Sequence, residues 1–560
     1  MKDFDELMTL VGSHGPFQRW VMWGVVGPIN IFIGLTVNLL LFQLKVPDHW
    51  CHVPGIENTS LTPEEWKNLT IPRESDKFSS CSRYKVEWLD EGAEEPFLIH
   101  NITEACDQGW DHDTSEFLET MATKNEWFCE REGYINHIYS LNQAGHTVGT
   151  AIFPVIADRI TGRRLMFFVC LAIHAVFTFP IAWVSNYGVI YALKFFGGLA
   201  FETINMMSYV SGFEFLAPEK RTTGSLITFA GWTFGTCLTS LTGWLIPRFQ
   251  YLVVISCIPA VCGFLYWRYL PESPRWLLSR GKISECATAL LRVARSNHKT
   301  EVTREQLEAE LRILWNRQEK EVSLFEVLRY PKLRLRALIL IYMSACTFLI
   351  YGVVLLGVTV LSSNFFLSHF VLSLSELPSN GIGWAWTHYL GRRFTCILSF
   401  LTTAAFCVAA TFCLEDKWAM LAIAACIRLF STQLIYVGTI QSGEIFPTPI
   451  RSTGYAWMVV CGMAAMIATP YILHSGYGDS FPYWLLASFL LLGAFLGIFL
   501  PETIGLPLPQ TFEDAEKLGN GRPLMTWIHH WNQHRYMPVS SEEPDNLELK
   551  TGLNTREKEN

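Results

Sequence analysis

Twelve long apolar runs constrain this chain more than any other feature of its sequence. The first six lie near residues 21–44, 135–157, 165–185, 187–211, 222–247 and 250–270. The other six lie near residues 334–358, 364–386, 394–413, 418–442, 452–475 and 481–500. Each run has roughly 20 residues or more, enough for a helix to cross about 30 Å of hydrocarbon. The pattern predicts an all-α membrane protein with twelve transmembrane helices, six on each side of a polar stretch.

Composition agrees with a membrane protein and argues against several other classes. The 560 residues are 50% hydrophobic and only 17% charged, whereas a soluble protein has about a quarter charged residues. No basic stripe or zinc-finger spacing points to nucleic acid as a partner. The chain also lacks HExxH, GxSxG and GxxxxGK[ST] motifs and clustered His and Cys ligands. We therefore predict no enzyme activity, no cofactor, no metal site and no direct use of ATP.

The segment 45–132, between the first two runs, has the marks of a large extracellular loop. It contains all three N-glycosylation sequons of the chain, and glycans are added only on the lumenal side of the membrane. The sequons begin at Asn58, Asn68 and Asn101. Four cysteines, which on this oxidising side could form two disulfides in any of three pairings, share the loop. They are Cys51, Cys81, Cys106 and Cys129.

The charges of this loop are unbalanced, with 20 Asp and Glu against 8 Lys and Arg. Two interpretations are open. The loop is a solvated glycoprotein surface, or its field enriches cations at the mouth of the protein.

An outward loop at 45–132 predicts that both chain ends are cytoplasmic, because the number of spans is even. The positive-inside rule agrees, since 271–333 carries 12 Lys and Arg. The part of that segment that reads EVTREQLEAELRILWNRQEKEVSLFEVL has helical spacing. Its apolar stripe consists of Leu307, Leu311, Leu314 and Trp315. The predicted order is a cytoplasmic start (1–20), a first half (21–270), a cytoplasmic helical loop (271–333), a second half (334–500) and a cytoplasmic polar tail (501–560).

A basic, glycine-centred turn occurs twice. ADRITGRR at 157–164 follows the second run and THYLGRR at 387–393 follows the eighth, which is the same place in each set of six. Transporters built from paired halves show such internal repeats and place the substrate site between the halves. The first copy carries one residue more than the second.

At these turns the sequence resembles the major facilitator superfamily, and five further segments resemble its organic cation, organic anion and carnitine transporters (solute carrier family 22). The segments are FDELMTLVGSHGPFQ (4–18), PDHWC (47–51), PESPRWLLSRGK (271–282), SGEIFPTPIRSTG (442–454) and LPETIGLPLP (500–509). The resemblance covers about residues 4–515. It implies the major facilitator fold and secondary-active or facilitative transport by alternating access at the plasma membrane.

The resemblance also implies a network of charges on the inner face that breaks and reforms as the halves move. Asp158 is expected to cap a neighbouring helix and to pair with arginines. The expected gating residues are Asp158, Arg159, Arg163, Arg164, Glu214, Arg221, Glu272, Arg275, His388, Arg392, Arg393, Glu444 and Arg451.

Three features of the turns depart from the family pattern. One residue is added between Asp158 and Gly162, Pro154 stands where the family has a third glycine, and His388 replaces the usual acid. They predict a weaker inner gate or one that responds to pH, since histidine titrates near neutrality.

Polar groups inside the predicted spans are candidates for substrate binding, because burying them in a membrane costs free energy. Glu202 has Asn205 and Tyr209 at i+3 and i+7, so the three share one helix face. Glu376 matches an acidic position of the cation transporters, and Arg428 matches a basic residue found across much of the family. The full set is Glu202, Asn205, Tyr209, Tyr351, Glu376, Arg428, Tyr436 and Met463.

Two of these positions lack charges that the resemblance leads us to expect. Met463 stands where cation transporters have Asp and anion or carnitine transporters have Arg, and Tyr436 stands where cation transporters have Glu. Two carboxylates, Glu202 and Glu376, against Arg428 would leave a slightly negative, aromatic-lined cavity that suits an amine or zwitterion. The alternative interpretation is that either acid forms a structural ion pair with Lys194 or Arg428.

We therefore predict a transporter of small organic ions that favours cations or zwitterions. Its expected partners are this substrate, the lipid bilayer and a coupling ion or counter-substrate. The alternatives are an organic anion transporter and a transporter-like sensor without net transport.

Overall fold

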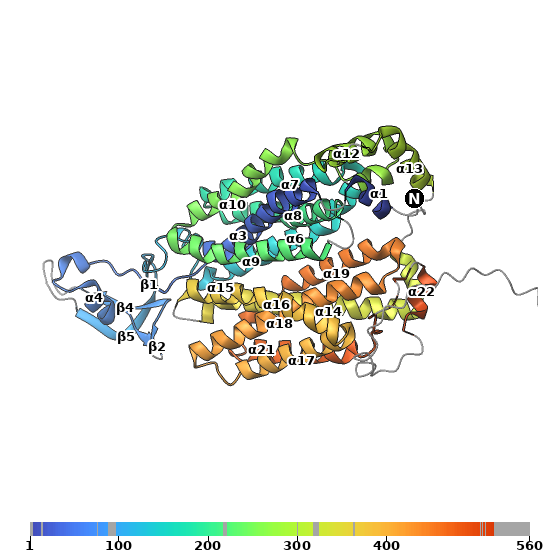
Figure 1. Ribbon diagram of the computed structural model, residues 1–560. Helices are drawn as coiled ribbons and strands as arrows, with labels where there is room; N and C mark the ends of the chain where they lie inside the picture. Colours follow the sequence, from blue (N-terminus) through green and yellow to red (C-terminus); the bar gives the residue numbers. More distant parts are fainter. Residues whose placement is uncertain are drawn as a thin grey trace, which may run out of the picture. The chain divides into compact units, whose positions relative to one another are not determined.

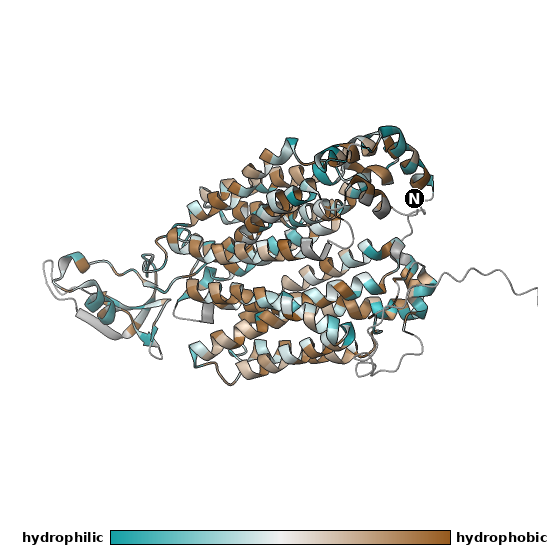
Figure 2. Cartoon of the chain, in the orientation of Figure 1, coloured by the Kyte–Doolittle hydropathy of each residue, from teal (hydrophilic) through white to brown (hydrophobic). Residues whose placement is uncertain are grey.

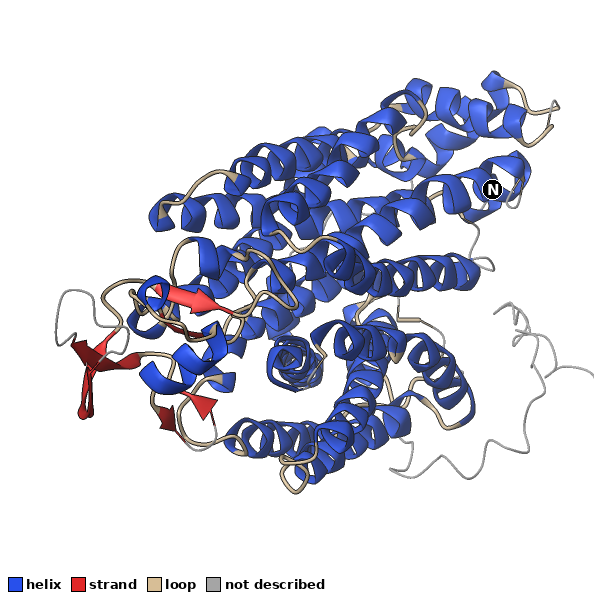
Figure 3. Cartoon of the chain, turned by 90° about the vertical axis from the view of Figure 1, so that its left-hand side faces the viewer, coloured by secondary structure: helices blue, strands red, loops and turns tan. Residues whose placement is uncertain are grey.

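The computed structural model describes residues 4–12, 15–74, 77–87, 97–216, 221–299, 301–316, 324–361, 364–504, 506, 508–509 and 511–519. Residues 1–520 form one compact unit. Most of its described residues are helical (Figures 1 and 3).

Six helical spans correspond to the first six apolar runs, and we call them the N-terminal helices. They are α2 (Pro16–Trp20), η1 (Val21–Val26) and α3 (Gly27–Gln43) in one span, α6 (Gly133–Ile156), α7 (Arg163–Thr178) continued by η5 (Phe179–Ala182), α8 (Tyr187–Phe213), α9 (Arg221–Leu245), and α10 (Phe249–Gly263) continued by η7 (Phe264–Arg268). In this group α6 packs on α8, α3 on α9 and α7 on α8.

Six further spans correspond to the other runs, and we call them the C-terminal helices. They are α14 (Pro331–Leu361), α15 (Phe365–Leu374) with α16 (Glu376–Tyr389), α17 (Arg392–Ala410), α18 (Lys417–Ile445), α19 (Arg451–Met466) with α20 (Thr469–Leu473), and α21 (Phe481–Gly497). Here α17 packs on α21 and α18, and α14 packs on α19 and α18.

By length and hydropathy, seven helices within the described residues could cross a membrane. They are Pro16–Gln43, Arg163–Ala182, Phe249–Arg268, Pro331–Val358, Arg392–Ala410, Lys417–Ile445 and Arg451–Leu473, and Phe481–Gly497 is a shorter apolar helix. The eighth run is not one continuous helix, since it divides between α15 and α16. Hydrophobic residues extend along both groups of helices, as Figure 2 shows.

Glycines allow the N-terminal helices to approach each other at backbone distance. A Cβ added at Gly145 of α6 would lie 2.4 Å from the carbonyl oxygen of Phe195 in α8. A Cβ at Gly235 of α9 would lie 2.1 Å from the carbonyl oxygen of Ile31 in α3. Small residues favour such packing in membranes, where lipid gives no hydrophobic drive for helices to associate.

The segment between α3 and α6 contains all the described strands, in three antiparallel pairs. These are β1 (His49–Cys51) with β6 (Trp110–His112), β2 (Arg73–Glu74) with β3 (Lys77–Phe78), and β4 (Ser82–Glu87) with β5 (Phe97–Ala105). Short helices accompany them: η2 (Ile56–Asn58), α4 (Pro63–Thr70), α5 (Met121–Lys124) and η3 (Cys129–Arg131).

Two disulfides hold this segment together, and the structure decides among the three possible pairings. Cys51 bonds to Cys106, and Cys81 bonds to Cys129. Of the three sequons, Asn68 lies exposed in α4, whereas the side chains of Asn58 and Asn101 fall outside the described residues.

The segment after α10 is helical, as predicted. It contains α11 (Pro274–Ser279), α12 (Ile283–Ser296) and α13 (Arg304–Asn316), followed by η8 (Leu324–Arg329), and α22 (Phe512–Lys517) lies near α14. Leu307, Leu311 and Leu314 are buried. Trp315, on the same predicted stripe, is 37% exposed, and its ring lies beside Gly281.

The first helix, α1 (Phe4–Val11), packs into the same hydrophobic cluster as α11–α13. The amide of Asn297, just after α12, donates to the carbonyl oxygen of Gly12 at 2.9 Å and to Gln18 Oε1 at 3.0 Å. The start of the chain is thereby fixed to this helical segment. In Figure 1, α1, α12 and α13 lie at one end of the helices and the strands lie at the other.

Candidate functional site

A glutamate caps the first Gly-Arg-Arg turn. Glu272 Oε1 accepts the backbone N–H groups of Arg163 at 2.9 Å and Arg164 at 3.1 Å, at the start of α7. The Arg163 side chain pairs with Asp158 at 3.0 Å and with Glu214, at the end of α8, at 3.3 Å. A carboxylate is favourable at a helix N-terminus, where the first N–H groups lack intrahelical partners.

The second turn repeats this arrangement. Glu502 accepts the backbone N–H groups of Arg392 and Arg393, each at 3.0 Å, at the start of α17. The Arg392 side chain pairs with Glu444, at the end of α18, at 3.1 Å. The repeat extends to the second arginine of each turn. Arg164 donates to the carbonyl oxygen of Trp267, and Arg393 donates to that of Ile498.

A π-helical turn accommodates the extra residue of the first copy. Residues Ala157–Thr161 form η4, in which the N–H of Gly162 donates to the carbonyl oxygen of Ala157 at 2.9 Å. Single π-helical turns of this kind occur mostly inside α-helices and are frequent at functional sites. Gly162 then has φ 86° and ψ 168°, and Gly391 has φ 91° and ψ 162°. The two turns therefore reach the same backbone geometry in spite of their different lengths.

Asp158 also takes part through its backbone. Its carbonyl oxygen accepts Trp276 Nε1 at 2.8 Å and Arg280 Nη2 at 2.6 Å, both from the segment around α11. This contact joins the first turn to the helical segment after α10. The side chain of Asp158 pairs with Arg163, and the gating role of this pair stays a prediction.

The remaining expected gating residues are placed less uniformly. Arg275 lies over the ring of Phe4, 4.8 Å from its centroid, and Arg451 donates to the carbonyl oxygens of Phe446 and Pro509. Arg159 is exposed. His388, at the place of the missing acid, stacks on Trp384. Arg221 begins α9, and its side chain falls outside the described residues.

Glu376 and Arg428 form a buried ion pair among the C-terminal helices. They are 2% and 1% exposed, and Arg428 Nε donates to Glu376 Oε1 at 2.8 Å. Tyr351 donates its hydroxyl to the same oxygen at 3.1 Å, and its ring centroid lies 3.5 Å from the Arg428 guanidinium. Trp232 Nε1, from α9, donates to Glu376 Oε2 at 3.2 Å. The carboxylate is therefore neutralised and fully hydrogen-bonded, as in the alternative interpretation.

Glu202 has a different environment. Its side chain is half-buried, and Asn205 Nδ2 donates to it at 3.4 Å. Among the described residues no lysine or arginine pairs with Glu202. Lys194, which the alternative interpretation names as a partner, donates to Gln43 Oε1 at 2.9 Å. Two turns after Glu202 along α8, Tyr209 stacks on Phe213, 4.0 Å between ring centroids. The carboxylate is the unneutralised acid of the two that the sequence singled out.

The last two candidates lie at helix contacts. Met463 of α19 is buried, and Thr150 of α6 donates to its sulfur at 3.8 Å. Tyr436 of α18 packs beside Gly383 of α16, where an added Cβ would come within 2.9 Å of its ring. Neither residue adds a charge to this region.

Further contacts join the N-terminal and C-terminal helices near the loop 45–132. Ser240 Oγ of α9 and His369 Nδ1 of α15 are 2.8 Å apart, and Ser140 of α6 donates to the carbonyl oxygen of Ile467 at 2.8 Å. The rings of Phe42 in α3 and Phe365 in α15 also meet, with centroids 4.7 Å apart.

Sequence reasoning missed two residues of these sites. Glu502 lies in LPETIGLPLP, and its correspondence with Glu272 in PESPRWLLSRGK could have been found from the shared Pro-Glu-Ser/Thr pattern. Trp232 is one of 20 tryptophans, and no spacing marks it as the partner of a residue 144 positions away.

Comparison with known proteins agrees with this geometry. Residues 107–514 match the family described as "Sugar (and other) transporter". The carcinine transporter of Drosophila melanogaster is 27% identical over 92% of this chain and 79% of its own length. Organic cation transporter 1 of Caenorhabditis elegans is 26% identical over 92% and 89%. The resemblance to this group of transporters is confirmed.

A solved structure confirms the fold. The xylose transporter XylE of E. coli, a member of the major facilitator superfamily, superposes with a TM-score of 0.58. The alignment covers 87% of this chain and 99% of XylE at 15% identity. The predicted all-α membrane fold of the major facilitator type is thus correct.

Proposed function

The chain belongs to the Sugar (and other) transporter family, and from this premise we propose that its cargo is a small organic cation or zwitterion. Membership of the family makes the protein a membrane transporter rather than an enzyme. The nature of the cargo follows from the charges at the candidate site.

The observation that carries the proposal is the unequal neutralisation of the two acids. Glu376 is balanced by Arg428 at 2.8 Å, so this pair contributes little net field. Glu202 has an amide neighbour and no cation among the described residues, so it leaves one negative charge for a ligand to balance. A charge in a low-dielectric environment attracts an opposite charge strongly. A substrate ammonium group fits this requirement better than a carboxylate does.

The surroundings of Glu202 favour an amine further. Tyr209 and Phe213 present stacked rings two to three turns after Glu202 along α8, and aromatic faces attract organic cations. Among the relatives, one is named for organic cation transport and another for carcinine transport.

We propose that transport proceeds by alternating access between two halves, 21–270 and 334–500, with 271–333 as a helical loop between them. The paired turns capped by Glu272 and Glu502 would act as equivalent latches, one for each half. The expected gating residues would break and reform their ion pairs as the halves exchange positions. A coupling ion or counter-substrate would supply the driving force.

For topology, we propose a plasma-membrane protein with both ends cytoplasmic, where 501–560 forms a polar tail. Support comes from the sequons and the two disulfides in one loop. Treatment of the expressed protein with a glycosidase should increase its gel mobility, and Asn58→Gln, Asn68→Gln and Asn101→Gln together should remove that shift. An unchanged mobility of the wild type would contradict the outward placement of the loop.

The test of the cargo is uptake into expressing cells from three panels: quaternary amines, amino-acid-like zwitterions and aromatic carboxylates. We expect uptake of amines or zwitterions that falls at least about tenfold in Glu202→Gln, consistent with loss of a partly desolvated charge contact. Glu202→Asp should retain part of it. Glu415→Gln, at an exposed acid, is the matched control and should transport normally.

Two results would overturn the proposal. Robust carboxylate uptake that survives Glu202→Gln would make the protein an organic anion transporter. Saturable amine binding to the purified protein without accumulation in cells would make it a sensor.

A further inference from the structure

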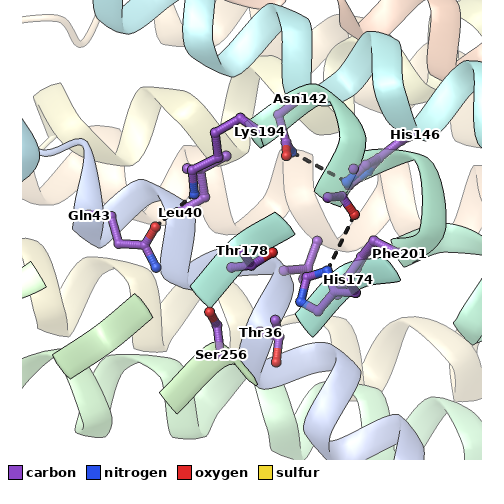
Figure 4. Close-up of a pocket in the computed structure, with 13 residues that line it drawn as sticks. Thr36, Leu40, Gln43, Asn142, His146, His174, Thr178, Lys194, Phe201 and Ser256 are labelled. Carbon is purple, nitrogen blue, oxygen red and sulfur yellow. Dashed lines mark hydrogen bonds between the residues drawn. The ribbon is translucent and has the colours of Figure 1, made fainter. Parts of the chain in front are cut away.

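A small polar cavity lies entirely within the N-terminal helices, apart from the site around Glu202. It has a volume of about 40 Å³ and is lined by residues of α3, α6, α7, α8 and α10. Figure 4 shows Lys194, His146 and His174 around it, with Gln43, Thr178 and Ser256. This volume has room for a monatomic ion or one to three waters, and it is too small for an organic substrate.

The ionisable residues that line the cavity are all basic. Its lining includes one lysine and two histidines, and none of the thirteen described lining residues is acidic. Lys194 is 6% exposed, His146 5% and His174 8%. Glu202 lies on α8 like Lys194, but eight residues further along it, which is about 12 Å along the helix axis.

The ammonium of Lys194 is buried next to the cavity. It donates to Gln43 Oε1 at 2.9 Å and is buried with it. An ammonium can donate three hydrogen bonds, and the described residues accept one. An ammonium buried in a membrane span without a counter-ion is costly and marks a functional site.

His174 supplies a second, independent observation. Its Nδ1–H donates to the carbonyl oxygen of Gly197 at 3.3 Å, so Nε2 is the acceptor nitrogen of a neutral imidazole, and it is buried without a hydrogen-bond partner among the described residues. Buried polar atoms nearly always have a partner, so an unpartnered acceptor next to a cavity indicates a place for a hydrogen-bond donor such as a water. His146, on the facing helix, is already engaged by Asn142 Nδ2 at 3.3 Å.

We propose that this cavity binds one small monovalent anion, of which chloride is the natural candidate. The anion would accept hydrogen bonds from the Lys194 ammonium and supply the charge that the lining lacks. A water that donates one hydrogen to the anion and the other to His174 Nε2 would link the two, and Thr178 would complete a polar wall. The site is separate from the cargo site and would not require transport to be observed.

Binding can be measured on the purified full-length protein with radioactive chloride and, independently, by thermal unfolding. Sodium chloride is exchanged for sodium gluconate at constant ionic strength, since gluconate is too large for the cavity. We expect about one chloride per chain and a saturable increase in Tm of about 3 °C or more. Bromide should replace chloride, because it is a similar monatomic anion.

Lys194→Met should abolish chloride binding and the Tm response. In gluconate this variant should be at least as stable as the wild type, because the unneutralised cation is gone. His174→Gln, which keeps a polar side chain of similar size, should weaken binding at least about fivefold and provides a second variant if Lys194→Met expresses poorly. Lys417→Met, at an exposed lysine at the start of α18, should respond to chloride like the wild type.

The proposal is overturned if wild-type Tm and chloride retention are the same in chloride and gluconate, which would leave the cavity to water. It is also overturned if Lys194→Met binds chloride as the wild type does. Neither result bears on the cargo, which is tested by uptake.

Discussion

At the scale of single residues, the two acids of the candidate site are predicted to differ in their importance for stability. Glu376→Gln leaves the Arg428 charge buried without its partner. Arg428→Met likewise leaves the Glu376 charge buried without its partner. Removing one partner of a buried pair costs about 3–5 kcal/mol, whereas replacing both can be nearly neutral. We therefore expect each single variant to lose Tm and surface expression, and the double variant to recover most of both.

Glu202→Gln is the comparison for this experiment. Among the described residues no cation pairs with the Glu202 carboxylate, so its removal leaves no buried charge without a partner. Tm in detergent should therefore stay within about 2 °C of the wild type even though uptake falls. A Glu376→Gln variant with wild-type Tm would show that the pair is not structural.

The sequence predicted which charged residues belong to this site, but not which acid pairs with Arg428. The intramembrane charges Glu202, Glu376 and Arg428 were visible in the sequence because each interrupts an apolar run. Glu376 is the first residue of α16, and α16 packs on α18, which carries Arg428. The Arg428 contact joins residues 52 positions apart and the Trp232 contact joins residues 144 apart, and local spacing encodes neither.

At the scale of elements, the glycines of the two turns should be equally intolerant of a side chain. Gly162 and Gly391 have backbone angles that are almost exclusive to glycine. A Cβ would lie 2.4 Å from Glu272 Oε2 in one turn and 2.7 Å from Glu502 Oε2 in the other. We expect Gly162→Ala and Gly391→Ala each to cost about 1–3 kcal/mol and to reduce uptake.

Gly438→Ala in α18 is the matched control, because a Cβ there meets nothing within 4 Å. It should retain wild-type Tm and uptake. If Gly162→Ala were tolerated while Gly391→Ala was not, the π-helical first turn would be the looser of the two, as its extra residue had suggested. Comparable losses would show that η4 restores the geometry in full.

Elements were predictable where one physical property dominated. Apolar length located all twelve helical spans to within a few residues, because a membrane helix must be hydrophobic over its whole span. The strands of the loop were not predicted, since they are two to nine residues long and the disulfides fix much of their arrangement. The extra residue before Gly162 was visible, but whether a π-helical turn or a shifted helix would absorb it was not.

At the scale of the whole molecule, two kinds of contact lie at different ends of the helices. The capped turns with Arg163 and Arg392 lie where α6 and α16 end. The Ser240–His369 contact lies close to the loop, since Pro247, just after α9, accepts the N–H of Leu118 at 2.9 Å. Under alternating access, the contacts on the loop side must separate for substrate to enter from that side.

The last prediction tests this separation. In Ser240→Cys/His369→Cys, a short bis-methanethiosulfonate cross-linker should join α9 to α15, because Ser240 Oγ and His369 Nδ1 lie 2.8 Å apart and the spacer covers the shorter reach of two cysteine side chains. Uptake should fall by at least about 80% after cross-linking and return after reduction, since locking one of two packed arrangements prevents their exchange. Cys237 lies one turn from Ser240 and is free, so the experiment uses a Cys237→Ala background. Each single-cysteine variant measures the effect of substitution without a bridge. A bridge that forms completely while uptake continues unchanged would mean that this side does not open, and the two groups of helices would then not be the moving halves.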